Sequence, residues 1–253
     1  MKLVKPILNI SAYLFVSLTD TAALRESIRS QASERQLKGT VLLAEEGINL
    51  FLAGPTDAVH SFLAWLQLDP RFASLQAKES HADSVPFKKL LVKVKPEIIR
   101  MNRPTVRPET ARAAAVDAKT LARWLRSGLD DANRPVVMLD TRNAFEVAHG
   151  SFNGAVHWNL SKFSDFPEAA LVHAAELQGK TVVSYCTGGI RCEKAAIFMA
   201  QAGLQNVLQL DGGILKYFED VGSEHYEGVC FVFDEREALA ANLRAVGSQE
   251  APL

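Results

Sequence analysis

The sequence predicts an α/β protein of two consecutive domains, a βαββαβ domain followed by a parallel-sheet domain. Apolar alternation beginning at Ile10–Leu18 opens a series of strands and helices that runs to about residue 95. Residues 96–116 are basic, contain prolines and show little periodicity, which is typical of a linker. Over residues 117–236 helices alternate with short apolar strands, the pattern of a parallel sheet with helices on both faces. Residues 237–253 form a C-terminal tail.

The first domain, residues 1–95, is expected to contain four strands and two helices. In chain order these are a strand over Ile10–Leu18, a helix over Asp20–Arg35, paired strands over Gly39–Ala44 and Ile48–Ala53, a helix from Pro55 to about Leu68, and a strand over Leu90–Lys95. This order is typical of a ferredoxin-like or acylphosphatase-like sheet with its helices on one face. Such domains have many functions, so the fold alone indicates none.

The second domain begins with a helix over Asp117–Gly128 and then alternates strands and helices. The further elements are a strand over Val136–Leu139 ending at Asp140, a short helix over Asn143–His149, a strand over Ala155–Trp158, a helix over Leu171–Leu177, a strand over Thr181–Tyr185, a helix over Ile190–Ala202, a strand over Val207–Leu210, and a helix opened by Asp211–Ile214. In parallel sheets the loops at the carboxyl ends of the strands carry the functional site.

Composition excludes several classes of protein. A formal net charge of −1 leaves no global basic field for nucleic acid, and no segment approaches the ~20 apolar residues of a membrane span. Lys2 and Lys5 imitate the start of a signal peptide, but Asn9 and Ser11 interrupt the apolar run, which suits a first strand better. Three cysteines without a C-x-x-C pair indicate a reducing cytoplasm and no structural metal site. The oligomeric state is not predicted.

The candidate catalytic residue is Cys186, at the turn from a predicted strand to a predicted helix. Unpaired backbone N–H groups at a helix N-terminus favour the thiolate, the nucleophilic form of cysteine. Glycines let the loop curl into a concave nest, and Arg191 adds a permanent positive charge. The active-site loop thus comprises Thr187, Gly188, Gly189, Ile190 and Arg191. The alternative is a buried structural cysteine.

The two other cysteines are expected to differ in role. Cys192 lies in the first turn of the predicted helix, where it either resolves an oxidised Cys186 as a transient disulfide or packs against the sheet. Cys230 alternates with Phe231 and Phe233 in an apolar stretch and is expected in the core.

Polar residues interrupt the predicted hairpin of the first domain. Glu45, Glu46 and Asn49 belong either to a tight turn in which Gly47 supplies a positive φ, or to a loop that reaches over the Cys186 pocket. His157 and Asp211 are candidates to face the same pocket, without assigned roles.

Positive charge is concentrated between residues 87 and 112. The basic residues there are Lys88, Lys89, Lys93, Lys95, Arg100, Arg103, Arg107 and Arg112, against only Glu97 and Glu109. Such a stretch either binds a polyanion or forms a solvated strand face and linker. Phe87 is its one aromatic residue, so the stretch does not predict base recognition.

The spacing of the loop carries further information. Cys186 and Arg191 bound a loop of six residues, which resembles the active-site loop of rhodanese-type sulfurtransferases. A related phosphatase family has one more residue there, so the shorter loop favours sulfur chemistry over phosphate-ester hydrolysis. Asp140, Arg142 and Glu146 resemble the first-half signature of rhodanese domains, where such residues mostly maintain the fold.

Three stretches together resemble the bacterial tRNA uridine-34 5-hydroxylase family: Glu45–Asn49, Tyr185–Ala195 and Cys230–Arg236. The resemblance implies a cytoplasmic enzyme that oxygenates C5 of the wobble uridine in tRNA. It implies molecular oxygen as co-substrate, no recognised metal or flavin, and catalysis at Cys186. The alternative from another class is a sulfurtransferase that carries a persulfide on Cys186.

One departure concerns the C-terminus. Longer members of that family continue into a cysteine-rich tail, whereas Glu237–Leu253 contains no cysteine. The basic stretch is therefore the best local candidate for tRNA contact, with the candidate residues Lys88, Lys89, Arg100 and Arg103.

Overall fold

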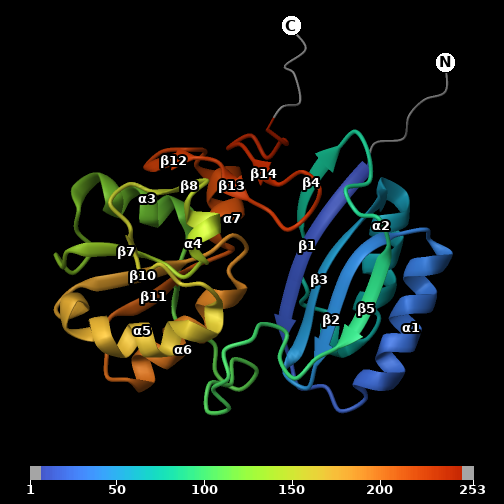
Figure 1. The fold of residues 1–253 in the computed structure, drawn as a ribbon, viewed down its shortest axis with the longest axis horizontal. Coiled ribbons are helices and arrows are strands. Elements are labelled where there is room, and N and C mark those ends of the chain that lie inside the picture. The colour runs from blue at the N-terminus through green and yellow to red at the C-terminus, as the bar shows by residue number, and fades with distance from the viewer. Residues whose placement is uncertain (1–6, 247–253) are drawn as a thin grey trace, which may run out of the picture. The chain divides into compact units, whose positions relative to one another are not determined.

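The computed structural model describes residues 7–246, which form two compact units (Figure 1). The first unit comprises the described residues up to Ile99 together with Phe233–Arg236, and the second comprises Arg100–Val232 and the described residues from Glu237 onward. Lys2, Lys5 and the last residues of the predicted tail lie outside the described residues.

The first unit is a five-stranded sheet with two helices. Its elements are β1 (Ile7–Phe15), α1 (Thr21–Glu34), β2 (Lys38–Ala44), β3 (Gly47–Pro55), α2 (Thr56–Gln67), β4 (Lys78–Ala82) and β5 (Leu90–Val94). The strand order is β4-β1-β3-β2-β5. Strand β3 runs antiparallel to both β1 and β2. Ile28 of α1 and Phe62 of α2 share one apolar core with strand residues such as Leu50. The predicted ferredoxin-like arrangement is confirmed.

The fourth strand of this arrangement is not the one that the sequence predicts. Strand β4 pairs antiparallel with β1, from Ile7 opposite Ala82 to Ser11 opposite Lys78. The predicted strand Leu90–Lys95 instead forms β5, a fifth strand that pairs parallel to β2 at the other edge. Strand β4 escapes prediction because its sequence, KESHA, has no apolar alternation. An edge strand gains its order from main-chain pairing and tolerates polar side chains.

The second unit contains a five-stranded parallel sheet in the order β6-β11-β10-β7-β9. Its elements are β6 (Ala115–Val116), α3 (Ala118–Ser127), β7 (Val136–Asp140), α4 (Ala144–Val147), β8 (Gly150–Phe152), β9 (Val156–His157), α5 (Phe166–His173), β10 (Thr181–Tyr185), α6 (Ile190–Gln201), β11 (Val207–Leu210), α7 (Gly213–Asp220), β12 (Tyr226–Gly228), β13 (Cys230–Phe231) and β14 (Ala238–Leu239). Helices α3 and α7 lie on one face of the sheet, and α5 and α6 lie on the other (Figure 1). The predicted parallel sheet covered on both faces is confirmed.

Four of the described strands, each of two or three residues, are not predicted by the sequence. Strands β6, β8, β12 and β14 are too short to show a periodicity. The apolar stretch that begins at Cys230 is a strand only over Cys230–Phe231, and Phe233 is half exposed. The helix expected at Leu171–Leu177 begins five residues earlier, at Phe166, and ends in a 3₁₀ turn over Ala174–Leu177.

The predicted linker is largely packed. Ile98, Met101 and Val106 are all buried. Ala115 and Val116 form β6, the edge strand beside β11. Residues 96–116 are therefore an ordered part of both units, with a boundary between the two at Ile99.

Helix α7 begins in close contact with the turn that follows β10. Ile214 N donates to the Cys186 carbonyl at 3.0 Å, and Leu215 N donates to the Thr187 carbonyl at 3.1 Å. A Cβ on Gly213 would lie 2.4 Å from the Cys186 carbonyl oxygen and 2.7 Å from Gly189 N, and the φ of Gly213 is +67°. Only glycine allows this approach.

We predict that Gly213→Ala destabilises the second unit more than a positive φ alone explains. Gly203→Ala is the matched control, because Gly203 has a φ of +89° but a Cβ added there would meet no atom within 4 Å. The control should cost about 1–2 kcal/mol of unfolding free energy, and Gly213→Ala should cost clearly more because backbone atoms must move. Urea unfolding measures both, and equal losses would contradict the close approach.

Candidate active site

Cys186 follows β10, the central strand of the parallel sheet, and is 1% exposed. Gly189 adopts a φ of +98° and lies directly before α6, so the chain curls back over the sulfur. The N–H of Gly189 donates to Cys186 Sγ at 3.1 Å. The carboxyl end of a strand, a glycine turn and a helix N-terminus thus meet at the thiol, as the sequence predicts.

The electrostatics of the loop favour the thiolate. Burial acts to raise the pKa of the Cys186 thiol, but hydrogen bonding by Cys192, the charge of Arg191 and the backbone N–H groups of Arg191 and Gly189 lower this pKa to about 5. Burial and the neighbouring Cys186 raise the pKa of Cys192, which therefore stays a thiol and acts as the donor. Cys186 is ionised at neutral pH.

Cys192 and Cys230 are both buried, and Cys192 is hydrogen-bonded to Cys186. Its thiol is fully buried and lies 3.7 Å from the Thr141 hydroxyl, which itself donates to the Tyr185 carbonyl at 2.9 Å. The Cys192 N–H donates to the Gly189 carbonyl at 3.0 Å. These contacts are compatible with packing against the sheet, and the resolving role of Cys192 stays a prediction. Cys230 is fully buried in the apolar core, and burial raises the pKa of its thiol to about 12.

A buried ion pair fixes Arg191. Its two terminal nitrogens donate to the two carboxylate oxygens of Glu146, both at 2.6 Å. Glu146 is fully buried and also accepts from the Asn143 N–H at 3.1 Å. Two parallel charge-assisted hydrogen bonds set the plane of the guanidinium as well as its position. The Arg191 charge is thereby held next to the thiolate.

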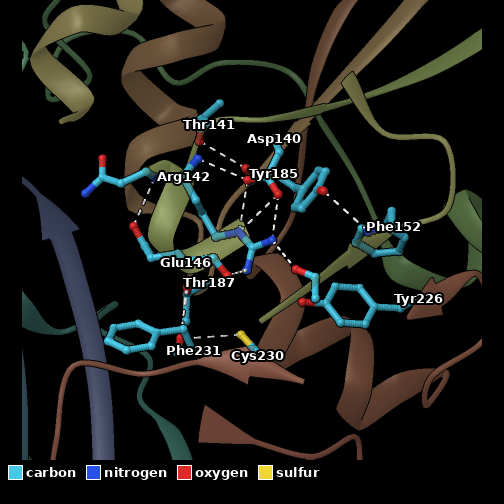
Figure 2. Close-up of polar contacts among 12 residues, drawn as sticks. Asp140, Thr141, Arg142, Glu146, Phe152, Tyr185, Thr187, Tyr226, Cys230 and Phe231 are labelled. Atoms are coloured by element: carbon cyan, nitrogen blue, oxygen red, sulfur yellow. Dashed lines mark hydrogen bonds and ion pairs between the residues drawn. The ribbon is translucent and has the colours of Figure 1, made fainter. Parts of the chain in front are cut away.

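Asp140 and Arg142 form a second buried pair, shown in Figure 2. Arg142 donates to both Asp140 oxygens, at 2.9 Å from Nε and 2.6 Å from Nη2, and also to the Gly150 carbonyl at 2.7 Å. Both side chains are fully buried. These contacts hold the chain after β7 against the start of β8, so Asp140 and Arg142 stabilise the fold. The sequence does not reveal Thr141 as a site contact, although it lies between these two residues.

The first-domain candidates bind their own unit. The Glu46 carboxylate accepts from Ile98 N at 2.7 Å, and Asn49 Nδ2 donates to the Ile98 carbonyl at 3.3 Å. Glu45 contributes its carbonyl, which accepts from Leu18 N at 2.9 Å. The φ of Gly47 is +146°, and a Cβ there would lie 2.1 Å from a carbonyl oxygen of β1. Glu46 and Asn49 therefore bind the N–H and the carbonyl of one residue, Ile98, in the chain that follows β5.

His157 and Asp211 occupy different places. His157 is exposed on β9, an edge strand that β7 separates from β10. Asp211 is 56% exposed and pairs with Arg112 at 3.1 Å. Arg112 also reaches Glu193 of α6 at 3.1 Å.

Several residues of the basic stretch are neutralised. Arg103 pairs with Glu168, and Arg107 pairs with Glu109 at 2.7 Å. Lys88 lies 3.8 Å from Glu235, and Arg100 donates to the neutral Asn102 at 2.9 Å. Further lysines are exposed and form no ion pair among residues 7–246, namely Lys89, Lys93 and Lys95.

Residues 7–246 contain neither a metal-binding cluster nor a membrane-spanning helix. No group of three or more His, Cys, Asp or Glu side chains is placed to hold a metal ion within that range. Each helix there is too short or too polar to span a bilayer.

Comparison with known families and proteins agrees with this architecture. Residues 7–98 match the UPF0176 acylphosphatase like domain, and residues 121–220 match the Rhodanese-like domain. A Bordetella pertussis protein named tRNA uridine(34) hydroxylase is 62% identical over 94% of this chain and 97% of its own length. Proteins of the same name from Cupriavidus pinatubonensis and Variovorax paradoxus are 58% and 59% identical, over 96% and 94% of this chain and 86% and 91% of their own lengths. By this identity over nearly its full length, the chain belongs to the tRNA uridine(34) hydroxylase family.

Proposed function

We propose that this chain hydroxylates C5 of uridine 34 in tRNA, with Cys186 as the reactive residue. The observation that carries the proposal is the 62% identity, over 94% of this chain, to a protein named for that activity. The site supports it, because a buried thiolate held by main-chain donors is a strong nucleophile shielded from water. Arg191, paired with Glu146, holds positive charge beside the sulfur.

Molecular oxygen is the co-substrate in this proposal. Converting C5–H to C5–OH takes one oxygen atom of O₂, and the second atom leaves as water after gaining two electrons and two protons. A thiolate and a thiol that become a disulfide release two electrons and one proton, and solvent supplies the second proton, which balances the reaction. In this proposal the pair is Cys186 and Cys192, which are hydrogen-bonded to one another.

A tRNA substrate and a reduced thiol pair support a cytoplasmic location in this proposal. For tRNA binding, Lys89, Lys93 and Lys95, which are exposed and form no ion pair with any described residue, are better placed than Arg103, which already pairs with Glu168. A phosphate gains most from a cation that has no competing carboxylate.

A second candidate function is transfer of sulfur as a Cys186 persulfide. The match of residues 121–220 to the Rhodanese-like domain favours it. In that reaction the thiolate takes the outer sulfur of thiosulfate, releasing sulfite, and passes it to cyanide as thiocyanate. Release of thiocyanate at a rate that Cys186→Ala abolishes, without any change in tRNA nucleosides, would favour this candidate over the hydroxylase.

We predict that a strain lacking this gene loses 5-hydroxyuridine from its tRNA, and that Cys186→Ala does not restore it. The thiolate is required, so the alanine variant should lose at least about 100-fold in activity, the scale of a missing catalytic group. Mass spectrometry of digested tRNA measures the nucleoside, and purified enzyme under ¹⁸O₂ should add 2 Da to the product. Cys230→Ala is the control, because Cys230 lies in the apolar core. An unchanged nucleoside profile would refute the hydroxylase.

We further predict that Cys192→Ala raises the pKa of Cys186, because the substitution removes a hydrogen bond to the thiolate. In the wild-type chain, absorbance of the thiolate at 240 nm should rise with pH around a midpoint of about 5. The protein holds the thiolate above that pH and the thiol below it. The midpoint should move upward in Cys192→Ala and stay in place in Cys230→Ala.

The same variant tests the electron source. In a single turnover without added reductant, the wild-type chain should lose two thiols for each nucleoside formed, and Cys192→Ala should form little product. Full product formation by Cys192→Ala under these conditions would show that electrons come from elsewhere.

For RNA binding, we predict that replacing Lys89, Lys93 and Lys95 with Gln weakens tRNA affinity and flattens its salt dependence. Each lost phosphate contact should reduce the slope of log K against log salt by about 0.7–0.9. Arg107→Gln is the matched control, since Glu109 already pairs with Arg107. Binding titrations at several salt concentrations measure both, and identical slopes for the triple variant and wild type would place the RNA elsewhere.

A further inference from the structure

Three aromatic side chains gather beside the active-site loop. The rings of Phe145 on α4 and Phe231 on β13 meet edge to face, with centroids 5.2 Å apart. The ring of His149, one helical turn after Phe145, lies 5.2 Å from the Phe231 ring. Phe145 is 48% exposed, His149 is exposed, and Phe231 is partly buried. We call these three residues the aromatic platform.

The platform is joined to the reactive loop at two points. The Thr187 hydroxyl, next to Cys186 in the chain, donates to the Phe231 carbonyl at 3.4 Å. Glu146, next to Phe145, binds Arg191 through both carboxylate oxygens. Figure 2 shows the Phe231 ring pointing away from Arg142 and the buried polar cluster. The platform therefore borders the loop and faces away from the core.

Glu146 is the buried residue of α4, whereas the Phe145 ring is half exposed. The apolar core of the unit includes Phe152 and Tyr185 but not Phe145 or Phe231. A single exposed apolar side chain is ordinary. A cluster of three rings beside a reactive thiolate is less common. Surfaces of this kind bind the unstacked bases of single-stranded RNA.

We propose that Phe145 and Phe231, flanked by His149, form the surface on which a base of the single-stranded anticodon loop stacks during the reaction. The inference rests on the proposed function, and it deepens it by naming residues that hold the RNA substrate. Stacking accepts any base, so the platform supplies affinity and position, and the loop supplies the chemistry. It also provides the aromatic contacts that the basic stretch lacks.

The experiment is a double-mutant cycle on binding. The full chain carrying Cys186→Ala, which cannot turn over, is titrated with an anticodon stem-loop RNA and with copies that lack the base at position 33, 34 or 35. Added to this chain, Phe145→Leu keeps an apolar side chain but no ring and should weaken binding of the intact RNA about 5- to 100-fold. Phe145→Trp should retain or improve affinity. Val172→Ala, which changes another exposed apolar residue on α5, should leave it unchanged.

The stacked base is identified by the loss of coupling. For the RNA that lacks that base, Phe145→Leu should have little effect, because the partner of the ring is already gone. Equal weakening of all four RNAs by Phe145→Leu, or no weakening of any, overturns the platform. Circular dichroism confirms that each variant is folded.

Activity separates this proposal from the function on which it rests. If the chain without substitutions forms 5-hydroxyuridine while Phe145→Leu shows no coupling to any base, the platform alone fails. If that chain neither modifies nor binds tRNA, the proposed function and the platform fail together.

Discussion

The buried ion pair between Glu146 and Arg191 is the interaction on which the rest of the site depends. Both side chains are nearly inaccessible to water, and two hydrogen bonds of 2.6 Å fix their geometry. Loss of one partner would leave an uncompensated buried charge, which typically costs about 3–5 kcal/mol. The pair also links α4, which carries Phe145, to the loop that carries Cys186. The Arg191 charge and the Phe145 ring are thereby positioned by the same contact.

The chemistry of Cys186 follows from two opposing effects. Burial penalises a thiolate, and hydrogen bonding by Cys192, the Arg191 charge and main-chain N–H groups outweigh that penalty. These donors are already in place before a substrate arrives, so no reorganisation is needed when negative charge develops. The close approach of Gly213 to the Cys186 carbonyl keeps the loop in this conformation. Helix α7 is therefore as much a part of the site as α6.

The sequence predicts features that depend on local pattern and not those that depend on distant partners. The elements around Cys186 are long or bounded by glycines, so β10, α6 and the loop are found where expected. Strand β4 is missed because its side chains are polar and only its pairing with β1 makes it a strand. The pairing of Arg103 with Glu168 joins residues far apart in the chain, and no spacing rule indicates it.

The same distinction separates two kinds of motif within the family resemblance. Glu46 and Asn49 bind the N–H and the carbonyl of Ile98. Arg236 bridges Asp234 to the Ser80 hydroxyl, which it reaches at 2.7 Å, and all these contacts lie within the first unit. These polar residues therefore have a structural explanation, because they fix the position of nearby main chain and side chains. The loop at Cys186 has no comparable structural need for a thiolate, because an uncharged side chain would avoid the cost of burying charge. The Cys186 loop is thus the stretch whose buried charge is not explained by main-chain contacts alone.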